Sequence, residues 1–304
     1  MTDRIDPARP GQPHEPGQEL SAVALTRAGK RIAGTSWTAG TSWTNVSEIR
    51  RFAASRRRDM RFRVVPFDRW GAINRAALAA SAILLAVLFF DPFASVWRSS
   101  LPEPVENVFK ILTRAGKSDW ILVGSGLFFL WGLGRDAAAM SKRAHLRHWA
   151  RAASAGYVFL AVAVSGILSL LLKYAIGRGR PRHFDEFGAF SFRFGEFDAS
   201  WASFPSGHAT TAMALAVALG LLYPRLRTLF ICAGFWVAFS RIVTGAHYPS
   251  DLCAGCAVGG LTAWLLARAF AQRRLVFKFD GGGGVRPRRR IGQSPRAPAA
   301  DQPR

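Results

Sequence analysis

The chain has 304 residues, half of them apolar, and its formal net charge is +22. This combination argues against a soluble globular domain and favours apolar segments in a membrane with basic segments at its surface. The basic segments also carry the charge to bind nucleic acid, but we expect anionic lipid headgroups as their partner and no nucleic acid.

The N-terminal segment, residues 1–69, is rich in Pro, Gly, Ser, Thr and Arg and holds thirteen of the 41 Lys and Arg residues. We predict a disordered basic tail, whose last part from Arg50 to Arg69 is suited to lie along an anionic membrane surface. The segment lacks the early apolar core of a cleavable signal peptide. The first apolar run is therefore expected to be an uncleaved membrane helix.

Six apolar runs follow, and a single charged residue, Asp91, lies within them. The runs are Ala76–Trp97, Trp120–Gly134, Ala152–Leu172, Ala209–Tyr223, Thr228–Ser240 and Leu252–Ala267. The third is a full span of roughly 20 residues, whereas several others reach that length only with flanking polar residues. A short run also fits a buried helix of a soluble protein, but six runs with Trp and Tyr at their ends favour membrane helices. We predict an all-α polytopic membrane protein with six transmembrane helices within residues 70–272.

The last segment, residues 273–304, contains a run of four glycines and the basic stretch Arg286–Arg290, and we predict a second disordered basic tail. Six helices place both termini on one side, and basic tails favour the cytoplasmic side. We expect the membrane to be a bacterial inner (plasma) membrane. The connections 98–119 and 173–208 are then expected to face outward. The sequence does not indicate an oligomeric state.

Three short motifs with the side chains of a phosphate-binding site lie at the edges of these runs. The first is Lys173-x6-Arg180-Pro181. The planar guanidinium of Arg180 is suited to donate two hydrogen bonds to a phosphate. A Lys at the end of an apolar run is costly unless it faces a polar cavity. Taken alone, Lys173 is better explained as an end residue whose ammonium reaches the membrane surface.

The second motif, Pro205-Ser206-Gly207-His208, precedes the fourth run. Ser206 is a favourable N-cap residue, and Gly207 allows a ligand to approach the backbone closely. The free N–H groups of a helix start attract an anion. A Pro-Ser-Gly turn is also a routine helix start, so His208 is what makes this motif informative.

The third motif is Ser240-Arg241-x5-His247-x3-Asp251, which joins the fifth run to the sixth. A carboxylate on one ring nitrogen of a His fixes its tautomer and leaves the other nitrogen free as a nucleophile. Asp251 is alternatively an acid favoured at a helix N-terminus by the helix dipole. With the outward loops predicted above, all three motifs are expected at the outer membrane face.

Together the three motifs resemble the three-part signature of the type 2 phosphatidic acid phosphatase (PAP2) superfamily, and every signature residue is present. The resemblance implies that His247 attacks phosphorus and becomes a phosphohistidine, and that Asp251 orients it. It implies that His208 protonates the leaving oxygen and then helps to activate water. It further implies phosphate-binding roles, with no metal and no cofactor, for Lys173, Arg180, Ser206, Gly207 and Arg241. The superfamily also contains soluble vanadate-dependent haloperoxidases, against which the apolar runs argue.

The expected function is that of a metal-independent lipid phosphate phosphatase at the extracytoplasmic membrane face. The sequence does not choose among phosphatidic acid, phosphatidylglycerol phosphate, an isoprenyl pyrophosphate and lipid A. A phosphotransferase would use the same residues, and a non-catalytic binder of anionic lipids would need only the basic tails. The aromatic segment 184–204 is either a loop packed on itself or a cap that senses or gates a lipid substrate.

The three cysteines, Cys232, Cys253 and Cys256, all lie in apolar runs. The last two are spaced like half of a zinc site, but a second pair and a nearby His at zinc spacing are missing. We expect small residues that pack between helices.

Overall fold

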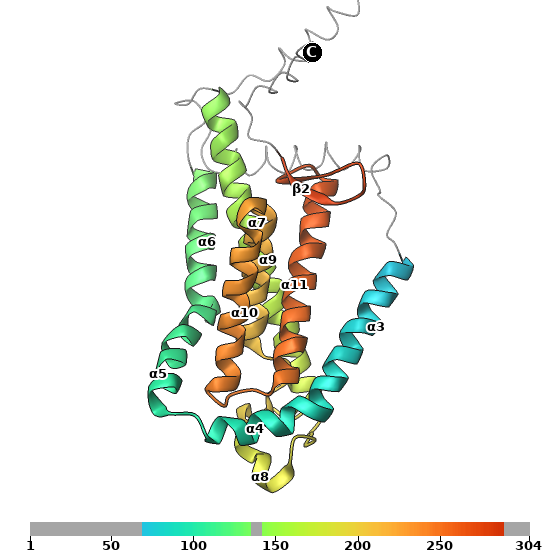
Figure 1. The fold of residues 1–304 in the computed structure, drawn as a ribbon. Coiled ribbons are helices and arrows are strands. Elements are labelled where there is room, and N and C mark those ends of the chain that lie inside the picture. Colours follow the sequence, from blue (N-terminus) through green and yellow to red (C-terminus); the bar gives the residue numbers. More distant parts are fainter. Residues whose placement is uncertain (1–68, 135–141, 289–304) are drawn as a thin grey trace, which may run out of the picture.

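The computed structural model describes residues 69–134 and 142–288, and the chain is predominantly helical there (Figure 1). A π-helical turn, Ala86–Phe90, joins helix α3 (Arg69–Leu85) to helix α4 (Asp91–Ser99), and α8 is a single short turn, Phe184–Phe187. The predicted N-terminal tail lies outside the described residues except for Arg69. The other helices are α5 (Glu103–Leu112), α6 (Ser118–Gly134), α7 (Lys142–Ile176), α9 (Gly207–Leu222), α10 (Arg227–Val243) and α11 (Pro249–Gln272).

Five of the six predicted apolar runs each coincide with one helix, because an apolar stretch without Pro or charge satisfies its backbone within the helix. The first run, Ala76–Trp97, contains Asp91 and Pro92 and continues from α3 through the π-helical turn into α4. Within the described residues, four stretches are long and apolar enough to cross a membrane: Arg69–Ser99, Arg147–Ile176, Pro224–Val243 and Pro249–Gln272. Helix α9 is a shorter apolar helix. Six membrane crossings therefore stay a prediction.

Helix α9 is the central element, packed against α7, α10 and α11. Its sequence is dominated by small residues, and nine of its sixteen residues are buried. A Cβ at Gly259 of α11 would lie 2.1 Å from the carbonyl oxygen of Thr210, so the two backbones are in direct contact. Small residues allow such close approach of membrane helices. This contact fixes the start of α9 against the middle of α11.

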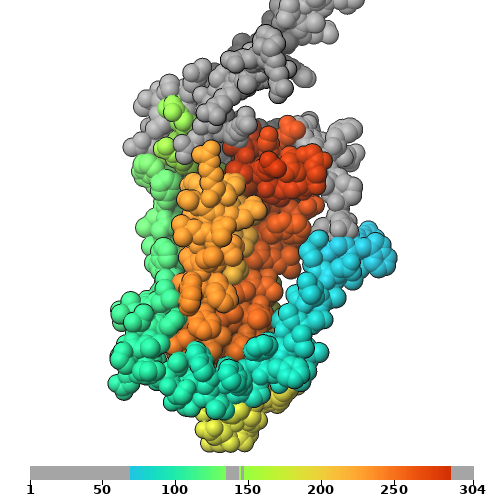
Figure 2. All heavy atoms as spheres, in the orientation of Figure 1, coloured from blue at the N-terminus to red at the C-terminus, as the bar shows by residue number. Residues whose placement is uncertain are grey.

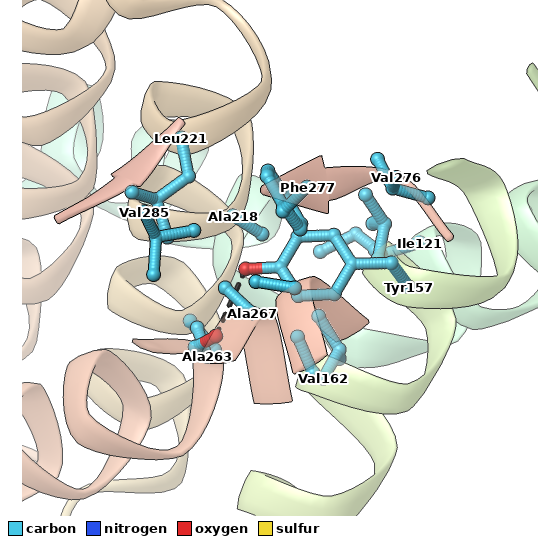
Figure 3. Close-up of a cluster of buried hydrophobic side chains, with 14 residues drawn as sticks. Ile121, Tyr157, Val162, Ala218, Leu221, Ala263, Ala267, Val276, Phe277 and Val285 are labelled. Carbon is cyan, nitrogen blue, oxygen red and sulfur yellow. Dashed lines mark hydrogen bonds between the residues drawn. The ribbon is translucent and has the colours of Figure 1, made fainter. Parts of the chain in front are cut away.

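A β-hairpin follows α11, where the sequence predicts a disordered tail from residue 273. Strand β1 (Phe277–Phe279) pairs antiparallel with β2 (Val285–Pro287), with Phe277 opposite Pro287. Phe277 is fully buried against the ring of Tyr157, whose hydroxyl donates a hydrogen bond of 2.9 Å to the carbonyl of Ala263 (Figure 3). Residues 277–287 thus differ from the predicted tail, because their apolar side chains close the core between α7, α9 and α11. Residues 289–304 lie outside the described part.

Helices α4, α5 and α8 lie at the end of the bundle opposite the hairpin (Figure 1). In the space-filling view, the segment around α8 protrudes beyond α4 at this end (Figure 2). Helices α7 and α10 end here, whereas α9 and α11 begin here, because the chain reverses direction at each connection. The ends of four helices that carry the three motifs therefore meet in one region.

Candidate active site

The three motifs occupy the helix ends that meet at this end of the molecule. Lys173 lies in the last turn of α7 and Arg241 in the last turn of α10. Ser206 is the N-cap of α9, and His208 follows in its first turn. His247 lies in the loop between α10 and α11, and Asp251 lies in the first turn of α11. Arg180 precedes a 3-10 turn, Pro181–His183.

His247 and Asp251 form a buried pair. The Nδ1 atom of His247 lies 3.5 Å from Oδ2 of Asp251, and both side chains are almost inaccessible to solvent. The same carboxylate oxygen accepts hydrogen bonds from Oγ of Ser203 at 2.6 Å and from the backbone N–H of Tyr248 at 2.9 Å. The Tyr248 bond caps α11, so Asp251 is both the N-terminal acid of its helix and the partner of His247. The two alternatives from the sequence are both realised.

Burial sets the charge of His247. It lowers the pKa of the imidazole to about 3, against the opposing effect of the hydrogen-bonded Asp251. The positive charges of Lys173 and Arg180 act in the same direction as burial. The imidazole is therefore neutral at neutral pH and keeps a lone pair on one ring nitrogen. With Nδ1 turned to Asp251, that nitrogen is Nε2.

Three cationic side chains near this pair lack an acidic partner in the described part of the chain. Among the described residues, Lys173, Arg180 and Arg241 form no ion pair with Asp or Glu. Their donors are only partly used: Nζ of Lys173 donates to the carbonyl of Ala202 at 2.8 Å, and Nη1 of Arg241 to Oγ1 of Thr113 at 2.9 Å.

The remaining donors of these cations suit an anionic ligand. Nε of Arg180 donates to the carbonyl of Ala199 at 2.9 Å, and burial together with the charge of Arg182 lowers the pKa of Arg180. Nε of Arg241 is buried and has no hydrogen-bond partner in the described part of the chain. Unbalanced cations with unused donors are the arrangement that a phosphate dianion neutralises.

The start of α9 joins this site through its backbone. The N–H of Ser206 donates to the carbonyl of Asp251 at 3.0 Å, and its hydroxyl caps the helix by accepting from the N–H of Ala209. A Cβ at Gly207 would lie 3.7 Å from Cε of Lys173, which places this glycine beside the cation. The charges of Lys173 and Arg241 also act on His208. The structure thus brings together all eight site residues predicted from the sequence.

Arg178 is the site residue that sequence reasoning missed. It is 1% exposed and uses its guanidinium donors on Asp91, Ser250, Asp251 and the carbonyl of Ala189. Burial alone would lower the pKa of Arg178, but Asp251 and Asp91 offset this and raise it. The isolated acid Asp91 in an apolar run was the available signal, because an intramembrane charge requires a partner.

The cysteines do not contribute to the site. All three are free thiols, and Cys256 packs against the buried cluster around Ala209 as expected. Cys232 is exposed on α10, so the prediction that it packs between helices is wrong. Its side chain faces away from the neighbouring helices because α10 buries the opposite face, around Val237 and Ala238.

Comparisons with known proteins agree in pointing to one family. A family model described as PAP2 superfamily matches residues 154–275. The chain is 40% identical over 221 residues to a lipid A 1-phosphatase of Rhizobium johnstonii, covering 72% of this chain and 88% of that protein. It is 30% identical over 144 residues to a decaprenylphosphoryl-5-phosphoribose phosphatase of Mycobacterium tuberculosis, covering 47% of this chain and 67% of that one.

Among solved structures, that of LpxE from Aquifex aeolicus matches with a TM-score of 0.42 and 17% identity, covering 57% of this chain and 92% of that chain. The family assignment rests on the sequence matches.

Proposed function

Since the chain belongs to the PAP2 superfamily, in its membrane lipid phosphatase branch, we propose that it removes the phosphate at the 1 position of lipid A through a phosphohistidine on His247. The observation that carries the chemistry is the buried, neutral His247 held against Asp251, beside three cations that form no ion pair with an Asp or Glu of the described residues. The lipid A 1-phosphatase relative, which this chain matches over most of its length, supports the substrate.

In the first step, Nε2 of His247 attacks phosphorus while the bond from phosphorus to the lipid oxygen breaks. The side chains of Lys173, Arg180 and Arg241 neutralise the equatorial phosphate oxygens in the transition state. His208 gives its proton to the departing lipid oxygen. The negative charge of the bound phosphate favours the protonated His208 that this step needs. The products are the dephosphorylated lipid and phosphohistidine 247.

In the second step, water replaces the lipid. His208, now neutral, accepts a proton from a water molecule whose oxygen attacks phosphorus, and the bond from Nε2 to phosphorus breaks. Inorganic phosphate leaves and His208 is protonated again. Asp251 stabilises the positive charge that the His247 ring carries while the nitrogen–phosphorus bond exists. The side chains supply all the neutralising charge, so the reaction proceeds without a metal.

The site faces outward in this proposal. The basic segments 1–69 and 273–304 favour the cytoplasmic side, and the second of them contains the hairpin, which lies at one end of the bundle (Figure 1). The motifs lie at the other end of the same helices (Figure 1). Phosphate would then be released on the extracytoplasmic side, and both termini would be cytoplasmic.

The test is phosphate release by the purified protein in detergent with a chelator present. The panel contains lipid A, phosphatidic acid, phosphatidylglycerol phosphate and an isoprenyl pyrophosphate, and we expect the highest turnover with lipid A. His247→Ala should abolish release from all of them. His148→Ala is the matched control, because His148 lies on α7 beside Gly132, away from the motifs, and should keep full activity.

Undiminished turnover by His247→Ala would refute the mechanism. A preference for another lipid would refute the substrate and leave the mechanism standing. Transfer of the phosphate to a second lipid instead of water would identify a phosphotransferase. Lipid binding without turnover in the wild-type protein would identify a non-catalytic binder.

A further inference from the structure

A buried network of charged groups lies behind the catalytic pair. Asp91 on α4, Arg178 after α7 and Asp251 on α11 are each at most 1% exposed. Nη1 of Arg178 donates to Oδ1 of Asp251 at 2.7 Å, and Nη2 donates to Oδ2 of Asp91 at 2.7 Å. One guanidinium thus connects the carboxylates of Asp91 and Asp251, which are 160 residues apart in the sequence.

Every donor of this guanidinium is occupied. Besides the two carboxylates, Nη1 donates to Oγ of Ser250 at 2.6 Å, and both Nη2 and Nε donate to the carbonyl of Ala189, at 2.8 and 3.2 Å. The ring of Tyr248 lies 4.4 Å from the guanidinium carbon. Five donors in a rigid planar fork allow one orientation for this side chain. Arg178 is therefore a fixed reference point beside Asp251.

Asp251 uses its two oxygens for different partners. Oδ1 accepts from Arg178, whereas Oδ2 accepts from Ser203 and Tyr248 and faces Nδ1 of His247. Because the first oxygen is held by Arg178, the carboxylate plane cannot rotate without breaking that bond. The direction of the second oxygen towards His247 follows from it.

Asp91 holds Arg178 from the other side. Its Oδ1 accepts from the backbone N–H of Ser250 at 2.9 Å, and its Oδ2 accepts from Oγ of Ser250 at 2.6 Å as well as from Arg178. When both carboxylates are ionised, the two carboxylates and the guanidinium together carry one net negative charge. Arg178 alone would neutralise Asp251, so Asp91 preserves the charge that favours a positive ring on His247 in the transition state.

We propose that Asp91 and Arg178 are positioning residues, which hold the Asp251 carboxylate in the orientation and charge state that His247 needs as a nucleophile. The proposal rests on the phosphohistidine function proposed above. A buried ion network is an inefficient means of stabilisation, since apolar side chains of similar volume are often as good. A role in orienting the nucleophile accounts for a charged network at this place.

The test compares Arg178→Lys, Asp91→Asn and Ser250→Ala with the wild-type protein on the lipid substrate that it hydrolyses best. Lysine keeps the charge but has no planar fork, so it cannot hold both carboxylates and Ala189. We expect kcat to fall about 100-fold for Arg178→Lys and Asp91→Asn, as for a displaced catalytic group. For Ser250→Ala, which keeps all charges and removes one bridging hydroxyl, we expect about a tenfold fall.

A positioning role predicts that KM and the inhibition constant of inorganic phosphate stay within about twofold of wild type, because the phosphate-binding cations are intact. Tyr157→Phe is the control for stability. It removes a buried hydrogen bond at the hairpin end and should lower the melting temperature without changing kcat.

Two results would overturn the proposal. One is a wild-type kcat in variants that show a lower melting temperature, as a purely structural network predicts. The other is a rise in KM and phosphate inhibition constant with unchanged kcat, as for direct contact with phosphate. If Asp91→Asn does not fold, Ser250→Ala decides by the same criteria. Failure of the proposed phosphatase function would appear as a different result: an inactive wild-type protein, or a His247→Ala variant that remains active.

Discussion

Replacing Asp251 by Asn tests the central electrostatic contact of the site. The change keeps the shape of the side chain but removes its charge and places an amide donor where the carboxylate accepts from Arg178 or from Tyr248. The imidazole of His247, 3.5 Å away, gains positive charge as Nε2 bonds to phosphorus. Its transition state therefore loses the attraction of the carboxylate.

The size of the loss follows from that distance. With an effective dielectric constant of about 20, a full positive charge at 3.5 Å from the carboxylate is stabilised by about 5 kcal/mol, and a half-developed charge by about 2.5 kcal/mol. We therefore expect kcat to fall by between about 50-fold and about 3,000-fold. KM should change little, because Asp251 does not touch the phosphate in this mechanism.

The assay is initial-rate phosphate release from the lipid over a range of substrate concentrations, with the melting temperature recorded for each preparation. Asp280→Asn is the matched control, because Asp280 pairs with the exposed Arg286 in the hairpin at the opposite end. A folded Asp251→Asn protein with kcat within twofold of wild type would refute the reasoning. So would a loss confined to KM.

Three further predictions concern other parts of the site. His208→Gln should slow the first step, measured as phosphohistidine formation in a single turnover, by about 100-fold to 10,000-fold for a lipid phosphate, and much less for an aryl phosphate whose leaving oxygen needs no proton; equal losses in this step for both substrates would contradict the acid role. Because the folded pKa of His247 is about 3 and the ordinary value is 6.5, the unfolded state binds more protons between these values. The melting temperature should therefore fall as pH drops from about 6.5 towards 3, and less steeply in His247→Asn. Finally, Phe194 and Phe197 are each 79% exposed near the site. Changing both to Ser should raise KM for long-chain lipids but not for a soluble phosphate ester, whereas equal effects would favour a loop that only packs on itself.

The sequence predicted the helices and the eight motif residues because both signals are local. A long apolar run in a membrane favours a helix, because a helix satisfies its own backbone hydrogen bonds. The motif spacings place charged side chains at the ends of these runs. The meeting of these ends at one face followed from the alternation of helix direction. For the segment 184–204, the sequence left two alternatives, a loop packed on itself and a cap over a lipid substrate. Trp201 is buried under Arg193, as in a packed loop, whereas Phe194 and Phe197 are exposed, as a cap requires.

Arg178 could not be recognised in this way. It is one of three arginines at alternate positions, 178, 180 and 182. The motif and the proline that follows distinguish Arg180, but nothing local distinguishes Arg178 from Arg182. Only the fold does so: Gly177 has a φ of +59°, and its carbonyl accepts from the N–H of Arg193 at 2.7 Å, which turns the chain at the end of α7. The next residue then faces inward. Contacts between segments far apart in sequence decide which arginine is buried.

The C-terminal hairpin was missed because four consecutive glycines lie between its strands and an arginine-rich stretch, 288–290, follows it. Its strands are three residues long, and their alternation of apolar and basic side chains is too short to stand out.

The hairpin also sets where the chain tolerates shortening. Ending the chain after Gln272, where the sequence predicts the tail to begin, would remove Phe277 and Val285 from the buried cluster and leave the ring of Tyr157 uncovered. Such a protein would present apolar surface at the membrane boundary opposite the site and would tend to aggregate on extraction into detergent. A chain that ends after residue 288 keeps the hairpin over this buried cluster, so an affinity tag should be attached after residue 288.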